Sequence, residues 1–240
     1  MDFRLSKKGH RYSLNIQESL TQISSFTSKL LRKKFGRGPE TCSATLSKNY
    51  LILHIRGFIS PMEEILITQG KPEYVEKARG CVILTVLEEV AGYTQSVLNV
   101  EIDQFHDDWN FSNNSGIMIL DLLDTNHIAI EDLSVDYLSE FEEEISRISA
   151  MLQKVPEQIV TTVPSESFIL VKRFGILIEI EKALIKKGFS DELLLTKSEL
   201  EKKYFHLEGH FEKIVGRKIR DIFISWNFKQ DESLMCFVLK

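Results

Sequence analysis

The sequence has little of the residues that mark disordered, collagen-like or disulfide-rich proteins. Its 240 residues include only 12 glycines, 5 prolines and 3 cysteines, and no tract is dominated by one residue type. This scarcity, together with 43% hydrophobic residues, excludes a low-complexity chain and supplies apolar material for one large core or two modest ones. The cysteines, Cys42, Cys81 and Cys236, are odd in number and widely spaced. We therefore expect reduced thiols and a cytoplasmic protein.

Long hydrophobic runs and an excess of positive charge are missing as well. The longest apolar stretch, around Cys81 to Leu87, is far shorter than the roughly 18 to 20 residues that cross a membrane. The N-terminus lacks the apolar segment of a secretory signal. A formal net charge of -5 argues against a nucleic-acid partner, because such proteins neutralise phosphates with clustered lysine and arginine. The composition predicts no transmembrane segment, so any role at a membrane is expected to be peripheral.

An internal repeat is the strongest signal that the chain does contain. Trp109-Asn110-Phe111 recurs as Trp226-Asn227-Phe228, a displacement of 117 positions (226 minus 109). Upstream the displacement is 118 (175 minus 57), and the matched residues there are Gly57, Glu63, Leu66, Ile67 and Gly70 with Gly175, Glu181, Leu184, Ile185 and Gly188. One deleted residue reconciles the two blocks. We expect two copies of one domain, residues 13–123 and 137–240, joined by a polar linker at 124–136.

Hydrophobic periodicity gives the same order of elements in both copies. The stripe from Ile16 to Leu31 steps by three and four as a buried helical face does, and Leu138 to Leu152 repeats it. Two extended segments, a short helix from Pro61, a long helix and two closing strands follow. The expected buried face of the long helix is Val75, Ala78, Val82, Val86, Val90 and Val97, and its counterpart is a continuous helix with Leu200, Tyr204, Leu207, Phe211 and Ile214. The order α-β-β-α-α-β-β predicts an α+β fold, with antiparallel sheets, helices packed on one face and a pseudo-two-fold arrangement.

The end of the first helix holds the favoured ligand site. Gly36-Arg37-Gly38-Pro39 follows a basic run, so backbone amides and guanidinium groups are placed to hold an anion such as phosphate or bicarbonate. The candidate ligand-binding residues are Gly36, Arg37, Gly38, Arg32 and Lys33. The same pattern is also an ordinary helix stop, because glycine caps helix C-termini, proline follows it and basic residues gather in the last turn. Both interpretations stay open at this point.

Histidines and tryptophans supply the remaining candidates. His206 and His210, at i and i+4, would share one helix face, a spacing that can seat a metal ion, although no third ligand is evident and two surface histidines are the simpler interpretation. His106-Asp107-Asp108 is either a cation site or, more simply, a solvated strand end. Trp109 and Trp226 occupy one position of a duplicated hairpin, so we expect them in a core or at a contact between copies. No catalytic triad or cofactor loop can be defended, so we expect neither an enzyme nor a cofactor.

With its elements laid out in this way, the first copy resembles the MpsC family of bacterial domains. The likeness rests on the helix ending in Phe35-Gly36-Arg37-Gly38-Pro39, the strand from Leu51 to Gly57 leading to Pro61, and the long helix that feeds Val100-Glu101-Ile102. The second copy departs from the pattern, because Lys154-Val155-Pro156 stands where the glycine-rich loop belongs. The resemblance implies an association with an MpsAB-like membrane system linked to cation flux and inorganic-carbon uptake, and it transfers no catalytic residues.

Two function classes follow from these observations. The first is a non-enzymatic cytoplasmic accessory or regulatory protein, which binds a protein partner of a membrane transport system and is peripheral to that membrane. Two copies in one chain also raise the expectation of a pseudo-dimer, and of a homodimer between chains. The alternative is a small-molecule or anion sensor that uses the Gly36-Arg37-Gly38 loop of the first copy.

Overall fold

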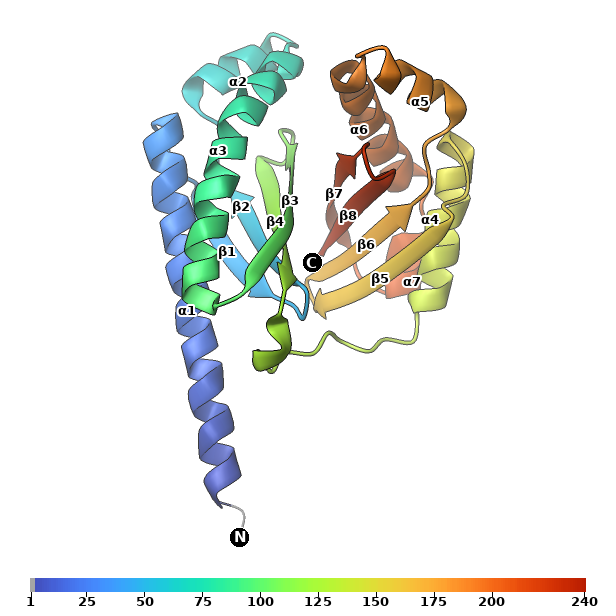
Figure 1. Cartoon of the computed structure of the whole chain (residues 1–240). Helices are drawn as coiled ribbons and strands as arrows, with labels where there is room; N and C mark the ends of the chain where they lie inside the picture. The colour runs from blue at the N-terminus through green and yellow to red at the C-terminus, as the bar shows by residue number, and fades with distance from the viewer. Residues whose placement is uncertain (1–2) are drawn as a thin grey trace. The chain divides into compact units, whose positions relative to one another are not determined.

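The computed structural model describes residues 3–240, and side chains from Ile16 onward. The chain folds as two compact units (Figure 1). The first comprises the residues as far as Phe105 together with Trp109–Ile130, and the second comprises His106–Asp108 together with Glu131–Lys240. Each unit contains one four-stranded sheet.

The first unit begins with a long helix and closes with a hairpin. Its elements are α1 (Phe3–Phe35), β1 (Thr41–Leu46), β2 (Tyr50–Arg56), α2 (Pro61–Thr68), α3 (Pro72–Leu98), β3 (Glu101–Asn110), β4 (Ser115–Leu123) and the 3-10 turn η1 (Thr125–His127). The strands lie in the order β1-β2-β4-β3, and β2 pairs antiparallel with both β1 and β4. Apolar side chains of α1 and α3, among them the fully buried Ile23, Leu31 and Ile83, form the core with the sheet. The predicted α+β architecture is confirmed.

The second unit repeats this topology. Its elements are α4 (Leu138–Leu152), β5 (Gln158–Ser165), β6 (Phe168–Phe174), α5 (Glu179–Lys186), α6 (Ser190–Leu207), α7 (Phe211–Val215), β7 (Ile219–Asn227) and β8 (Glu232–Leu239). The strand order β5-β6-β8-β7 matches that of the first unit. Even the register is repeated, because Ile55 lies opposite Gly116 in one sheet and Arg173 lies opposite Ser233 in the other. The duplication is therefore a property of the backbone as well as of the sequence.

A hydrogen-bonded turn holds the same place in both units. Asn114 and Asp231 adopt left-handed backbone conformations, with φ of 46° and 49°. The side-chain Oδ1 of Asn114 accepts hydrogen bonds of 2.7 and 3.0 Å from the two backbone amides that follow Gly57. Asp231 accepts two bonds of 2.8 Å from the amides that follow Gly175. Short polar side chains tolerate this conformation and satisfy nearby amides, so either residue can build the turn that leads from the sheet to the short helix.

The predicted continuous helix of the second copy is wrong, because α6 ends at Leu207 and α7 begins at Phe211. The chain turns at Gly209, where a Cβ atom would lie 2.3 Å from the Phe211 ring and 2.4 Å from the carbonyl oxygen of Phe205. The tight turn brings the two phenylalanine rings together, with their centroids 5.9 Å apart. Only glycine allows this approach. Phe211 packs in the core as expected, but Leu200 and Leu207, expected on the same buried face, are exposed at 46% and 70%.

Two further expectations for the first copy are corrected. Ala78 is exposed, and its expected place on the buried face of α3 is taken by Arg79, which is paired as described below. His106-Asp107-Asp108 does not form a solvated strand end: β3 continues to Asn110, and His106 and Asp108 are buried. Arg79, His106 and Asp108 are polar residues whose burial depends on partners that are distant in the sequence. The periodicity of a helix or strand does not reveal such partners.

One helix of the described part, α3, is long and apolar enough to cross a membrane by length and composition alone. Its apolar side chains have partners in the first unit, where Val75, Ile83, Val86 and Val90 are all buried. A core helix of this kind passes the same test as a membrane span. Core packing therefore accounts for part of the hydropathy of α3, because 39% of its most apolar stretch is buried.

The segment after β4 is ordered over much of its length. Ile128 and Ile130 pack against the core of the first unit, and the ring nitrogen Nε2 of His127 lies 3.0 Å from the carbonyl oxygen of Leu98. Leu133 donates its backbone amide to the carbonyl oxygen of Val163 in the second unit, at 2.8 Å. The predicted polar linker thus includes residues that are anchored to one unit or the other.

Candidate functional site

The loop predicted to bind an anion follows the end of α1, and its cations face solvent. Arg32, Lys33 and Arg37 are exposed, and in the described part of the chain none of them forms an ion pair. Gly36 has a φ of 73° and so ends the helix in the left-handed conformation. The side chain of Arg32 lies over Gly38, with its Nε only 2.9 Å from where a Cβ of that residue would be. The structure brings Arg32 and Gly38 together in a helix cap, and anion binding there stays a prediction.

A shallow hollow beside the same helix extends this basic surface. It has a volume of about 340 Å³, lies between α1 and β1, and is lined by Ser24, Ser25, Ser28, Lys29, Arg32 and Cys42. Burial raises the pKa of the Cys42 thiol to about 11. Because a protonated thiol is a poor nucleophile at neutral pH, the hollow presents hydroxyl groups and cations rather than a reactive cysteine.

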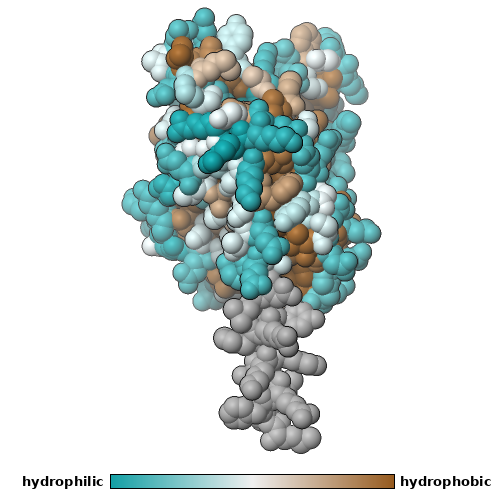
Figure 2. All heavy atoms as spheres, turned by 90° about the vertical axis from the view of Figure 1, so that its left-hand side faces the viewer, coloured by the Kyte–Doolittle hydropathy of each residue, from teal (hydrophilic) through white to brown (hydrophobic). Residues whose placement is uncertain are grey.

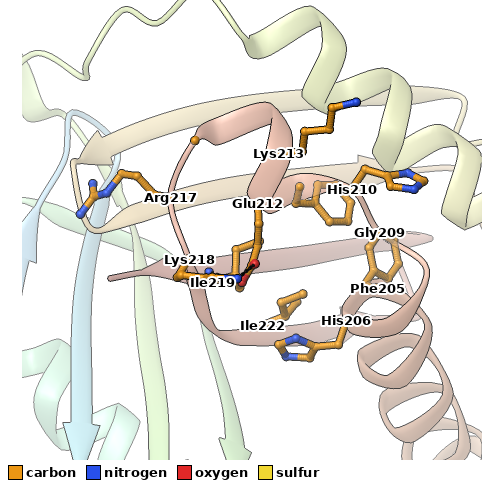
Figure 3. Close-up of a pocket in the computed structure, with 12 residues that line it drawn as sticks. Phe205, His206, Gly209, His210, Glu212, Lys213, Arg217, Lys218, Ile219 and Ile222 are labelled. Atoms are coloured by element: carbon orange, nitrogen blue, oxygen red, sulfur yellow. Dashed lines mark hydrogen bonds and ion pairs between the residues drawn. The ribbon is translucent and has the colours of Figure 1, made fainter.

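A larger hollow, of about 650 Å³, lies in the second unit where α6 gives way to α7 and β7 begins (Figure 3). Its lining is Phe205, His206, Gly209, His210, Phe211, Glu212, Lys213, Gly216, Arg217, Lys218, Ile219 and Ile222. Figure 3 shows the Glu212 carboxylate beside Lys218 and Ile219, whereas Arg217 and Lys213 extend away from it in different directions. The cations of this lining do not converge on one point.

The polar side chains that line this hollow form hydrogen bonds and ion pairs with neighbouring parts of the second unit. Glu212 accepts hydrogen bonds from Lys218 Nζ at 2.6 Å and from the backbone amide of Ile219 at 3.0 Å, and Lys218 is the main cause of the lowered pKa of this carboxyl. Arg217 Nε donates to the carbonyl oxygen of Lys240 at 3.0 Å. These bonds fasten α7 and the following loop to the sheet, so the hollow has a clear structural role.

His206 and His210 do not share a helix face, which corrects the expectation from their spacing. His206 belongs to α6, whereas His210 precedes the first residue of α7, and Figure 3 shows the two imidazoles pointing in different directions. Burial lowers the pKa of His206. The Nδ1 atom of His210 lies 3.0 Å from Glu144 Oε1. Among the described residues, no group of three His, Cys, Asp or Glu side chains is arranged to hold a metal ion.

Glu144 provides a test of the contact between α4 and the loop before α7. Its oxygens accept two hydrogen bonds of 2.8 Å from Arg147 and one of 2.7 Å from the His210 backbone amide. Arg147 is the main cause that lowers the pKa of Glu144 from 4.5 to about 2.

We expect Glu144→Gln to lower the free energy of unfolding by about 2 kcal/mol at pH 7, after allowance for solvent screening around the exposed Arg147. A lowered pKa means that the carboxylate stabilises the folded state fully above pH 4.5 and loses this effect as the pH falls towards 2. Urea unfolding of both proteins over this range should show a difference that shrinks with acid. A difference that is equally large near pH 2 would contradict the prediction.

A buried ion pair joins α2 and α3 beside the first repeated tryptophan. Arg79 Nε donates to Glu63 Oε1 at 2.7 Å, and Nη2 donates to Glu63 Oε2 at 3.0 Å and to the carbonyl oxygen of Phe58 at 2.8 Å. The guanidinium lies 4.5 Å from the centroid of the Trp109 ring. Glu63 also accepts a hydrogen bond from the Ser60 amide, which completes a capping box at the start of α2. One carboxylate thus serves both the helix cap and the buried arginine.

The second unit repeats the arrangement with lysine in place of arginine. Lys197 Nζ lies 2.7 Å from Glu181 Oε1 and 4.0 Å from the centroid of the Trp226 ring. Glu181 accepts a hydrogen bond from the Ile178 amide at 3.0 Å, in the manner of Glu63 in the first unit. Cation, carboxylate and tryptophan have therefore been kept together in both copies, which makes them part of the shared architecture.

The second unit has a further buried network that sequence reasoning missed. Arg173, 1% exposed, donates to Glu201 Oε2 at 2.6 Å, to Ser233 Oγ at 2.9 Å and to Ser149 Oγ at 3.2 Å. The equivalent positions of the first unit hold apolar or small residues, which are Ile55, Ile83, Gly116 and Leu31. A comparison of the two copies would have indicated this network, because Arg173 and Glu201 carry opposite charges at two positions where the first copy has isoleucine.

In each unit a short helix precedes a long one (Figure 1), and hydrophobic side chains of these helices are exposed. In the first unit these are Met62, Ile65 and Tyr74, with exposed fractions of 68%, 59% and 57%, and we call them the α2 surface. Ile180 and Phe189 are exposed at the corresponding helices of the second unit. Figure 2 shows hydrophobic patches among hydrophilic residues on the face that carries α1 and α3. Such patches are typical of contact surfaces.

Comparison with known families gives a match to each copy. The family model described as "Na+-translocating membrane potential-generating system (MpsC)" matches residues 16–123 and again residues 136–240. Together the two matches cover most of the chain, and the second includes the copy that lacks the glycine-rich loop. No match was found among curated proteins or among solved structures.

Proposed function

The chain belongs to the MpsC family, and from this premise we propose that it is a non-enzymatic accessory or regulatory protein of a Na+-translocating membrane system. It acts through protein-protein contacts at the cytoplasmic face of the membrane. The family description links the domain to generation of a membrane potential. Neither hollow described above presents a nucleophile activated by a base, and the buried arginines Arg79 and Arg173 are each paired with a carboxylate of their own unit. These features suit a binding protein.

The observation that carries the proposal is the α2 surface. Met62 and Ile65 lie one turn apart on the same side of α2, and Tyr74 lies at the start of α3. Side chains of this type dominate the energetics of protein interfaces when a partner covers them. The rigid base beneath them is the ion pair between Glu63 and Arg79, which fixes α2 against α3. A preorganised apolar surface loses less conformational entropy on binding than a mobile one.

The test is sedimentation of the purified chain with two kinds of membrane vesicle, from cells that carry the Na+-translocating system and from cells in which that system is deleted. The chain should bind only the first kind. Because the few central side chains of an interface contribute about 2 kcal/mol or more each, and a buried charge adds a desolvation cost, we expect Met62→Asp with Ile65→Asp to weaken binding at least about tenfold. Na+ transport by the same vesicles, with and without the chain, then shows whether the contact is regulatory.

A matched control separates loss of the surface from loss of the fold. Leu200→Asp with Leu207→Asp places the same two charges on other exposed hydrophobic residues, in α6 of the second unit. This variant should bind vesicles like the unaltered chain. Equal binding to both kinds of vesicle would indicate lipid binding instead, and undiminished binding of the double variant would refute a role for the α2 surface.

A further inference from the structure

The hollow between α1 and β1 has an equivalent in the second unit. A groove of about 410 Å³ lies between α4 and β5, and its lining includes Ser139, Glu142, Glu143, Ser146, Glu157 and Gln158. Ser146 stands at the position of Ser28, displaced by 118 (146 minus 28), the same displacement that relates Ile23 and Phe141 in the two cores. We call the two hollows the α1/β1 groove and the α4/β5 groove. The duplication therefore gives each chain two versions of one surface.

The two grooves carry opposite charge. The α1/β1 groove contains Lys29 and Arg32 and no carboxylate among its lining residues. The α4/β5 groove contains three glutamates, Glu142, Glu143 and Glu157, and no cation among its lining residues.

Three local differences produce this reversal, and the first is that Ala150 stands where the first copy has Arg32. Glu142 and Glu143 stand where the first copy has Ser24 and Ser25. Arg147, which stands where the first copy has Lys29, is turned away from the groove to pair with Glu144. Within the described residues, no ion pair is formed by Lys29 or Arg32 on one side, or by Glu142 or Glu143 on the other.

Each groove is bordered by an unpaired sheet edge. In the strand orders β1-β2-β4-β3 and β5-β6-β8-β7, β1 and β5 are outermost, so within residues 3–240 one side of each has no strand beside it. Such edges are templates for pairing with another chain. Antiparallel pairing of β1 with β5 of another molecule would place α1 and α4 side by side and antiparallel. Lys29 and Arg32, just after Ser28, would then meet Glu142 and Glu143, just before Ser146.

We propose that the α1/β1 groove of one chain binds the α4/β5 groove of a second copy of the same chain. The contact is between different surfaces of the two molecules, so each chain keeps one groove for a further contact: the first keeps its acidic α4/β5 groove and the second keeps its basic α1/β1 groove. Association then closes into a dimer or ring, or continues as an open assembly, according to the angle between successive chains. The contact goes beyond the proposed accessory function and uses none of the residues of the α2 surface.

Sedimentation velocity of the full chain over a range of concentrations is the test. The mean mass should rise above the 27.7 kDa of one chain with concentration, and high salt should reverse the rise because it screens exposed charges. Lys29→Glu with Arg32→Glu makes both grooves acidic, and Glu142→Lys with Glu143→Lys makes both basic. Each variant alone should associate at least about tenfold more weakly than the unaltered chain, since like charges then face each other.

A mixture of the two variants gives the decisive result, because acidic grooves of one protein then meet basic grooves of the other. We expect the mixture to recover association with a mass above that of either variant alone. Lys33→Glu and Glu140→Lys reverse charges on the same helices outside the grooves and should leave association unchanged. A chain that stays at one-chain mass at every concentration, or a mixture that fails to associate while both variants remain folded by circular dichroism, would overturn the proposal.

Discussion

Replacing Glu201 by isoleucine is expected to lower the free energy of unfolding of the second unit by about 3 to 5 kcal/mol. The substitution leaves the guanidinium of Arg173 buried at 1% exposure without its carboxylate partner, and Lys197, 3.6 Å from Glu201, loses a second contact. Desolvation of an unpaired charge is the dominant cost. The measurement is urea unfolding followed by fluorescence of Trp226, in a background where Trp109 is replaced by phenylalanine so that one unit supplies the signal.

The first unit supplies the matched control for this experiment. Its residues at the positions of Arg173 and Glu201 are Ile55 and Ile83. A fourfold variant therefore rebuilds the apolar core of the first copy in the second, with the substitutions Arg173→Ile, Glu201→Ile, Ser149→Leu and Ser233→Gly. Because a buried ion pair can be replaced by well-packed apolar residues at little cost, the fourfold variant should be about as stable as the unaltered unit, or more so. A fourfold variant less stable than Glu201→Ile alone would show that cavity or strain effects outweigh the charge.

Replacing Arg79 by methionine is expected to lower the free energy of unfolding of the first unit by at least about 3 kcal/mol. The substitution removes both hydrogen bonds to Glu63, the bond to the carbonyl oxygen of Phe58 and the contact with the Trp109 ring. Glu63 would remain buried with a charge that only the α2 cap partly satisfies. Fluorescence of Trp109, in a background where Trp226 is replaced by phenylalanine, reports this unfolding.

Arg79→Lys is the informative comparison, because the second unit already uses lysine at the equivalent position. Lys197 holds Glu181 with a single contact of 2.7 Å and lies over Trp226. We expect Arg79→Lys to retain most of the stability that Arg79→Met loses, with a residual cost of about 1 kcal/mol for the missing bond to the carbonyl oxygen of Phe58. Equal losses for lysine and methionine would mean that the shape of the guanidinium, rather than the charge beside the tryptophan, fixes α2 against α3.

The order of elements was predictable because the buried face of a helix or strand produces a regular spacing of apolar residues at nearby positions of the sequence. The stripe from Leu20 to Leu31 and its counterpart in α4 show this directly, since their apolar residues enter the two cores. The break between α6 and α7 was not predictable from that stripe. It depends on how closely Phe211 approaches Phe205, and the apolar spacing continues unchanged across Gly209.

The candidate sites were less accessible to sequence reasoning, for a related reason. Gly36-Arg37-Gly38 is a contiguous motif and was found, whereas Arg173 and Glu201 are 28 positions apart and come together only through the fold. The grooves beside α1 and α4 likewise join a helix to a strand that follows a loop. A position-by-position comparison of the two copies would have exposed both features, because it sets Ile83 against Glu201 and Ser24 against Glu142.

The different cores of the two units affect which helix packs on which sheet while the nascent chain folds. Tandem copies of one fold are liable to misassemble by exchanging equivalent segments while they fold. Here α6 carries Glu201 where α3 carries Ile83, so a helix that docks on the wrong sheet would either leave Arg173 stranded or bury a carboxylate among isoleucines. The divergence of the second core therefore disfavours exchange of α3 and α6, because only α6 on its own sheet pairs Arg173 with a carboxylate.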